Sequence, residues 1–199
     1  MMTLIAALLP AAPVDAEARQ RALAAAESGR WSDAEPVLVA LTADGESDVQ
    51  ALAALARFRQ EQKRHKEAVD LLKRAVQLSP KDSQLHSALG HALARRIGEV
   101  NFVHKGLIAG DMLTAYETAV ALDPNNLGAW IGLVHYYAEA PAIAGGSLEK
   151  AETYAREVER RDPHLGAREL AFVFEKAGRT AEAAEQKQKA AERAPGRRE

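Results

Sequence analysis

The chain has 199 residues, of which 47% are hydrophobic and 27% charged, a composition that suits one globular domain and argues against a wholly disordered chain. Its net charge of −2 at pH 7 lacks the basic excess that binding to nucleic-acid phosphates requires, so we expect no nucleic-acid partner. The absence of cysteine excludes disulfides, cysteine nucleophiles and zinc sites with thiolate ligands.

The N-terminal segment differs from the rest of the chain. Residues 4–9 form an apolar run that is too short to span a bilayer, and Val14 and Ala16 stand at the −3 and −1 positions of a cleavage site before Glu17. The positive residues that open a secretory signal are missing. We therefore expect residues 1–16 to be a truncated signal peptide of an exported, periplasmic protein. The alternative is an apolar N-terminus that packs on the first helix of a cytoplasmic protein.

Residues 17–195 are predicted to form five helical hairpins and no strand, followed by a basic tail at residues 196–199. Pro80, Pro124 and Pro163 end the second, third and fourth hairpins, because proline cannot continue a helix. Counting back twelve, eight and five residues from each proline reaches small or apolar residues. These residues are Ala68, Leu72 and Ala75, then Met112, Tyr116 and Ala119, then Ala151, Ala155 and Val158. The turns inside the hairpins are predicted near Gly29, Lys63, Gly146 and Gly178.

The first helices of the hairpins share a second pattern, in which an aromatic or small residue is followed by Leu and a small residue. Trp130, Leu133 and Tyr137 show it best. Together with the prolines and the glycine turns, this pattern resembles the tetratricopeptide repeat family, whose unit is a helix, turn and helix of about 34 residues. The resemblance implies an all-α, right-handed α-solenoid in which stacked hairpins share one core and leave a concave groove.

Two hairpins are longer than this period. Pro80 to Pro124 spans 44 residues and Pro124 to Pro163 spans 39. We expect the extra residues, near 97–106 and 141–147, to lie in the turns inside the third and fourth hairpins and to be neighbours in space. The segment Ala-Pro-x-x-x-Gly-Gly-Ser that begins at Ala140 is similar to one in a set of exported bacterial tetratricopeptide proteins.

The repeat frame predicts which side chains face the groove, and they form a mixed, mostly polar surface. These residues are Arg57, Gln60, Gln84, Ser87, His91, Arg95, Ile131, His135, Glu139, Arg168 and Phe172. No three consecutive hairpins carry the Lys, Asn and Arg set with which some members of the family clamp a terminal carboxylate. The alternative to a binding groove is a face that simply contacts water.

His91 and His135 occupy the same position in adjacent hairpins, so they should lie side by side on the groove. A metal ion bound there would need a third ligand such as Glu139. The alternatives are a pair of polar groove residues or histidines packed on neighbouring helices. We expect no metal and no cofactor.

Phosphate-binding loops, His-Glu-x-x-His and Gly-x-Ser-x-Gly are all absent, so we predict a non-enzymatic scaffold that binds a partner polypeptide. The alternatives are a self-associating module and, least favoured, a metal-dependent hydrolase that uses the histidine pair. The extra segments are predicted to form a lip beside the groove, with Phe102, Val103 and Ile143 as its apolar contacts. Alternatively, Phe102 and Val103 extend the following helix.

Overall fold

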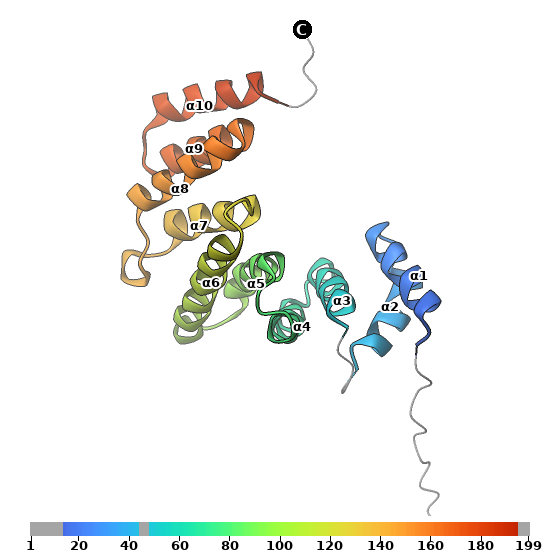
Figure 1. Cartoon of the computed structure of the whole chain (residues 1–199). Helices are drawn as coiled ribbons and strands as arrows, with labels where there is room; N and C mark the ends of the chain where they lie inside the picture. Colours follow the sequence, from blue (N-terminus) through green and yellow to red (C-terminus); the bar gives the residue numbers. More distant parts are fainter. Residues whose placement is uncertain (1–13, 44–47, 195–199) are drawn as a thin grey trace, which may run out of the picture. The chain divides into compact units, whose positions relative to one another are not determined.

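The computed structural model describes residues 14–43 and 48–194, without the side chains of Phe102 and Val103. The chain divides into two compact units, unit 1 (Met1–Leu78) and unit 2 (Ser79–Glu199). The described residues form ten α-helices and two short 3-10 helices and contain no strand, which confirms the all-α prediction (Figure 1).

Unit 1 consists of two hairpins. Its helices are α1 (Ala16–Glu27), α2 (Trp31–Leu41), α3 (Val49–Glu61) and α4 (His65–Leu78). The turns inside both hairpins contain a residue with positive φ, Gly29 at 71° and Lys63 at 59°, where the sequence predicts them. Helix α3 packs on α1, α2 and α4, and Leu38, Leu52 and Leu72 are completely buried between these helices.

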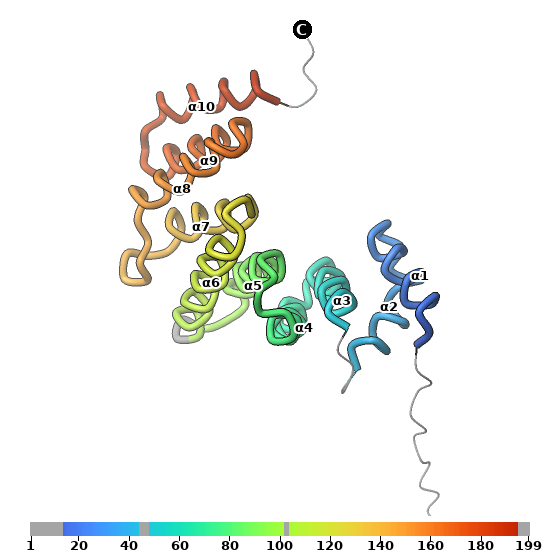
Figure 2. Tube along the Cα trace, in the orientation of Figure 1, coloured from blue at the N-terminus to red at the C-terminus, as the bar shows by residue number. Residues whose placement is uncertain are grey.

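Unit 2 consists of three hairpins, traced in Figure 2. Its elements are α5 (Ser83–Arg96), η1 (Ile97–Glu99), α6 (Phe102–Leu122), α7 (Leu127–Glu139), η2 (Ala142–Ala144), α8 (Leu148–Arg161), α9 (Pro163–Lys176) and α10 (Thr180–Glu192). Each helix packs on the next one in the chain, and the first helices of consecutive hairpins also meet, α5 with α7 and α7 with α9. This is the stacking expected of a helical-repeat solenoid.

Most of these helices begin at a polar residue whose side chain accepts a hydrogen bond from the first turn. The N-caps of this kind are Asp15, Asp48, Asp82, Asn101, Asn126, Ser147 and Asp162. Asn126 also joins two hairpins, because its amide donates to the carbonyl of Ser83 at 3.1 Å while the Ser83 hydroxyl donates to the carbonyl of Ala119 at 2.9 Å. The start of α5, the end of α6 and the start of α7 are thereby held together.

Most of the predicted signal peptide lies outside the described residues. Its described end belongs to the fold, because Asp15 caps α1 by accepting a hydrogen bond from the backbone N–H of Ala18 at 2.7 Å. The expected cleavage point between Ala16 and Glu17 therefore falls inside the first turn of α1.

The predicted turn near Gly146 is present between α7 and α8, and its residue with positive φ is the neighbouring Gly145, at 90°. One prediction about the turns needs correction. Residues 102–106, predicted to be part of a loop, are the first residues of α6, because Asn101 caps a helix there by accepting from the backbone N–H of His104. The backbone of Phe102 and Val103 thus extends the following helix, as the alternative interpretation held.

The small residues predicted at the helix crossings are buried. Ala68 in α4 and Ala151 in α8 have no exposed surface, and Ala75, Ala119 and Ala155 are equally buried. Such residues let the two helices of a hairpin approach closely, which explains the recurrence of alanine at the offsets from each proline.

Candidate functional site

The helices α5, α7 and α9 present a row of polar and aromatic side chains, which we call the α5–α7–α9 face. It consists of Gln84, His91, Arg95, Ile131, His135, Glu139, Arg168 and Phe172, and each of these side chains is exposed or half-buried. Ser87, also predicted on the groove, is instead buried where α5 approaches Gly128 of α7.

His91 is held by a tyrosine from the second helix of its own hairpin. The hydroxyl of Tyr116 lies 3.0 Å from Nδ1 of His91, and the two rings meet edge to face at 5.2 Å. The Tyr116 ring fits between α5 and α7 because Gly90 and Gly132 leave room for it, since a Cβ at either position would lie 2.5 Å or less from the ring. Burial raises the pKa of Tyr116 and, with the nearby Arg95 and His135, lowers the pKa of His91, so both groups are neutral at pH 7.

His135 links α7 to α9. Its Nε2 lies 3.0 Å from Oε2 of Glu169, a buried carboxylate, and its ring stacks on Phe172 with centroids 4.5 Å apart. The adjacent carboxylate of Glu169 raises the pKa of His135 against the opposing effect of burial. Lys176 approaches the same Phe172 ring, with its Nζ 5.3 Å from the centroid. The half-buried rings of His135 and Phe172 are therefore held by contact with each other, with Glu169 and with Lys176.

A pocket of about 190 Å³ opens near the turns of the third and fourth hairpins, where α5 and α7 end beside the first half of α6. Its wall includes Ala94, Ile97, Ala109, Met112, Tyr116, His135, Glu139, Pro141 and Ala144. Both extra segments thus contribute to one pocket, Ile97 from the first and Pro141 and Ala144 from the second. Ile143, predicted in the lip, points away from the wall into solvent with 92% of its surface exposed. The other predicted lip residues, Phe102 and Val103, have side chains outside the described structure.

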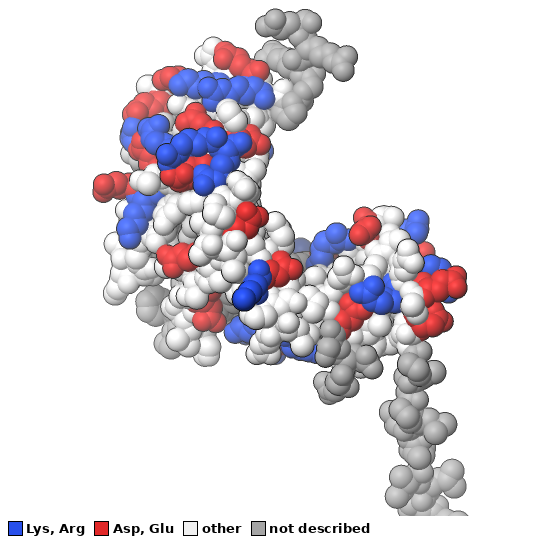
Figure 3. Space-filling view, viewed as in Figure 1, with Lys and Arg blue, Asp and Glu red and all other residues white. Residues whose placement is uncertain are grey.

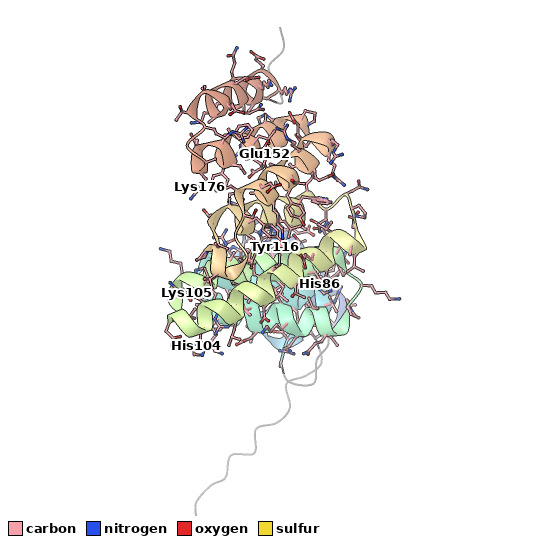
Figure 4. All side chains as sticks on the ribbon, turned by 90° about the vertical axis from the view of Figure 1, so that its left-hand side faces the viewer. His86, His104, Lys105, Tyr116, Glu152 and Lys176 are labelled. Atoms are coloured by element: carbon pink, nitrogen blue, oxygen red, sulfur yellow. The ribbon has the colours of Figure 1, made fainter. Side chains whose placement is uncertain are left out.

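Figure 4 shows where these parts of unit 2 lie. Tyr116 is near the middle of the unit, whereas Lys105 at the start of α6 and Lys176 at the end of α9 lie along one edge. Within unit 2, the face seen in Figure 3 carries most of its charged side chains over α8, α9 and α10, while the surface over α6 and α7 is mainly uncharged.

The predicted groove residues of unit 1 lie on α3. Arg57 donates to the carbonyl of Ala26, and its guanidinium lies 4.9 Å from the centre of the Trp31 ring. It also borders an open hollow of about 320 Å³ between α1 and α3, with Gln50 and Glu27 on the same wall. Gln60 is half-buried on the same helix and does not line this hollow. Both Arg57 and Trp31 are already engaged within the unit.

The histidine pair does not form a metal-binding cluster. His91 and His135 each have a ring nitrogen against a protein partner, Tyr116 and Glu169 respectively, and Glu139 lies instead 3.6 Å from Lys176. The part of the chain that the structure describes contains no group of three or more His, Asp or Glu side chains placed to hold a metal ion. Over the same residues, none of the helices has the length and hydropathy needed to cross a bilayer.

Two residues of the site were missed from sequence. Glu169 was not considered because a lone glutamate on a helix is usually exposed, although it stands between the core residues Ala167 and Leu170 and so falls on a buried stripe. Tyr116 was identified only as a packing residue. The signal that could have found its role is the pair of glycines on the two adjacent first helices, Gly90 one residue before His91 and Gly132 three residues before His135, which leave room for a large ring between these helices.

Comparison with known proteins identifies the type of helical repeat that this chain resembles. Residues 19–83 match the model of the tetratricopeptide repeat. The crystal structure of TTC0263, a thermophilic TPR protein of Thermus thermophilus, is 21% identical in sequence, with 91% of this chain and 92% of that chain covered and a TM-score of 0.71. YrrB, described as a TPR protein with an unusual peptide-binding site, is 18% identical, with 92% and 87% covered and a TM-score of 0.64.

A curated relative also matches, over a shorter length. The protein O-mannosyl-transferase TMTC1 of Mus musculus is 26% identical over 105 residues, which are 53% of this chain. The chain spans only 10% of the length of that protein. These similarities show a tetratricopeptide-repeat fold.

Proposed function

From the tetratricopeptide-repeat fold and the geometry of unit 2, we propose that the chain is a non-enzymatic scaffold that binds a partner polypeptide on the α5–α7–α9 face. The observation that carries the proposal is the cluster of His135 and Phe172. Both side chains are half-buried, and stacking between their rings and the contact with Glu169 hold them in one arrangement. Side chains that are already ordered lose little conformational entropy when a partner binds.

Neighbouring residues give this cluster the chemistry of a peptide-binding surface. Ile131 lies on the same face of α7, one helical turn before His135, and Arg168 lies one turn before Phe172 on α9. An aromatic and aliphatic centre with charged residues around it is the usual composition of a protein-binding site. Hydrolysis assisted by a metal has less support, because the two histidines and Glu139 make their contacts with separate protein partners.

Selection of displayed random peptides on the immobilised full chain tests the proposal. We expect enriched peptides whose affinity falls by about tenfold or more in Phe172→Ala, the size of effect typical of a central contact residue. The matched control is Leu122→Ala, which also shortens a partly exposed apolar side chain of unit 2 but lies on α6. If no peptide is enriched over a blank surface, or if Phe172→Ala binds as well as Leu122→Ala, the proposal is wrong.

Export to the periplasm is part of the same proposal. It is supported by the apolar run at residues 4–9 and by the small residues before Glu17. Fractionation of cells that express the full chain, followed by N-terminal sequencing, tests it. A periplasmic product that begins at Glu17 is expected, and an unprocessed cytoplasmic product would contradict it.

A further inference from the structure

The pocket at the turns of the third and fourth hairpins has the size of one side chain. Its volume is about 190 Å³. An apolar cavity of about 150 Å³ is known to hold benzene, whereas sites for drug-sized ligands span about 300–1,000 Å³. The pocket therefore has room for one aromatic ring or one large aliphatic group.

The interior of the pocket suits an apolar group. The hydroxyls of both tyrosines in the wall already have partners within the protein. The Tyr116 hydroxyl is bonded to His91, and the Tyr136 hydroxyl donates to the carbonyl of Ala144 at 2.7 Å. A polar group that entered the pocket would leave its hydration behind and gain few hydrogen bonds.

Exposed apolar side chains flank the pocket. Leu107 on α6 is 67% exposed and Ile143 on η2 is 92% exposed, the two highest values for large apolar residues in the described chain. Each is within two residues of a pocket-lining alanine, and α6 and η2 contact each other. A segment of a partner that placed a side chain in the pocket would also cover Leu107 and Ile143, and their burial would add to its affinity.

The charge beside the pocket selects the sign of the flanking residue. Glu139 is the one carboxylate in the wall, its side chain is 55% exposed, and Lys176 faces it at 3.6 Å. Helix α7 ends at Glu139, so the unpaired carbonyls of its last turn add partial negative charge at the same place. The protonated form of His135, which also lines the wall, is balanced by the carboxylate of Glu169. Lys176 is itself 44% exposed and such surface ion pairs contribute little stability, so a basic residue of a partner can take the place of Lys176 beside Glu139 and the helix end.

We infer that this pocket receives one aromatic or large aliphatic side chain of a partner polypeptide, and that a basic residue of the same segment lies against Glu139. The inference rests on the proposed function and adds to it a partner chemistry and a second site at the hairpin turns. The anchor contacts Met112 and Ala144, while the segment continues over Leu107 and Ile143.

The pocket contains a single spectroscopic reporter. The chain has three methionines, of which only Met112 lies outside the N-terminal dipeptide. Full-length protein with ¹³C-labelled methionine methyl groups can be titrated with N-acetyl-tryptophanamide, with N-acetyl-aspartamide as the polar control. We expect a saturating ring-current shift of the Met112 methyl signal with the tryptophan probe alone. No shift, or an equal response to both probes, would overturn the inference.

Two substitutions in one turn form a matched pair. Ala144→Leu fills the pocket from η2 while keeping the backbone carbonyl to which Tyr136 donates, whereas Ala142→Leu adds the same side chain two residues away at an exposed position outside the wall. The shift of the Met112 signal should disappear in Ala144→Leu and persist in Ala142→Leu. Equal melting temperatures of the two variants show that the fold is kept. A probe response that Ala144→Leu leaves unchanged would contradict the assignment.

Peptides selected on the full chain test whether the pocket binds a polypeptide. We expect an aromatic or large aliphatic residue next to Lys or Arg, an affinity reduced about tenfold or more by Ala144→Leu, and a loss of the preference for the basic residue in Glu139→Gln. Peptides whose binding depends on Phe172 but not on Ala144 would overturn the pocket inference and leave the proposed function intact. If the tryptophan probe shifts Met112 but no peptide binds, the proposed function and the polypeptide partner are both wrong.

Discussion

Adding one methyl group at Gly132 should displace the ring that joins the third and fourth hairpins. A Cβ at this position would lie 2.3 Å from Cε1 of Tyr116, whereas carbon atoms in favourable contact are about 3.5–4.0 Å apart. The Tyr116 ring is 2% exposed, and Gly90 approaches it from the other side. The ring can therefore yield only by moving against its other neighbours or by giving up its hydrogen bond to His91.

The expected cost follows from two opposing effects. Overpacking of a filled core costs about 1–3 kcal/mol, and replacement of glycine by alanine inside a helix gains about 0.5–1 kcal/mol. We therefore expect Gly132→Ala to lower the free energy of unfolding of unit 2 by about 1 kcal/mol, the difference between the middle values of these two ranges. Gly90→Ala should act in the same way, since its Cβ would lie 2.5 Å from the ring. The double variant should cost less than the sum, because the ring is displaced only once.

Urea unfolding measures this effect with two controls. In a Trp31→Phe background the remaining tryptophan, Trp130, reports on unit 2. Gly110→Ala is the matched control, because Gly110 is an exposed residue of α6 with no atom within 4 Å of its added Cβ, and it should stabilise by about 0.5–1 kcal/mol. In a Tyr116→Leu background the cost at Gly132 should vanish. If Gly132→Ala stabilises unit 2 as much as Gly110→Ala, the proposed steric conflict does not exist.

Three further predictions follow from the helices and their contacts. Ala68→Leu and Ala151→Leu should each cost about 1–3 kcal/mol and lower the melting temperature, because both alanines are completely buried; an unchanged melting temperature would refute the predicted crossings. Asp162→Ala removes the N-cap of α9 and should cost about 1 kcal/mol in urea unfolding, a loss that Asp162→Asn should avoid. Glu169 raises the pKa of His135 above 6.5, so the stability from this pair is complete below about pH 6.5 and is lost as the pH rises through the raised pKa. The melting temperature of the unaltered chain should therefore fall as the pH rises through this pKa, and Glu169→Gln should remove the fall. An unchanged pH profile in Glu169→Gln would exclude the pair as its cause.

Local chemistry explains why much of the fold was predictable from sequence. Pro80, Pro124 and Pro163 stand just beyond the ends of α4, α6 and α8, and Gly29 and Gly178 take the positive φ that the hairpin turns require. The start of α6 was harder to predict, because the stretch from Phe102 to Gly106 contains no residue that forbids either loop or helix. Asn101 was the available signal, since asparagine is a favoured N-cap.

The site was predictable only in part, for a different reason. The equivalent places of His91 and His135 follow from the repeat period, which depends on sequence spacing alone. Their partners come from other helices, Tyr116 from α6 and Glu169 from α9. Such contacts depend on how the helices pack and on side-chain rotamers, neither of which is encoded in local spacing. The pocket was harder still to predict, because its wall combines residues of five elements, α5, η1, α6, α7 and η2.

The extra residues of unit 2 explain why a pocket exists at the hairpin turns. Helix α6 has 21 residues, compared with 13 or 14 in the other helices of the unit. The turn after α7 folds back on itself, with the N–H of Gly146 donating to the carbonyl of Pro141 at 3.1 Å. Gly146 is required there, since a Cβ would lie 1.7 Å from the carbonyl oxygen of Ala140. The backbone of η2 is thus held by hydrogen bonds while its Ile143 side chain remains in water. Ordering a turn costs conformational entropy that the burial of Ile143 does not offset in the free protein, which favours a role for this turn in contact with another molecule.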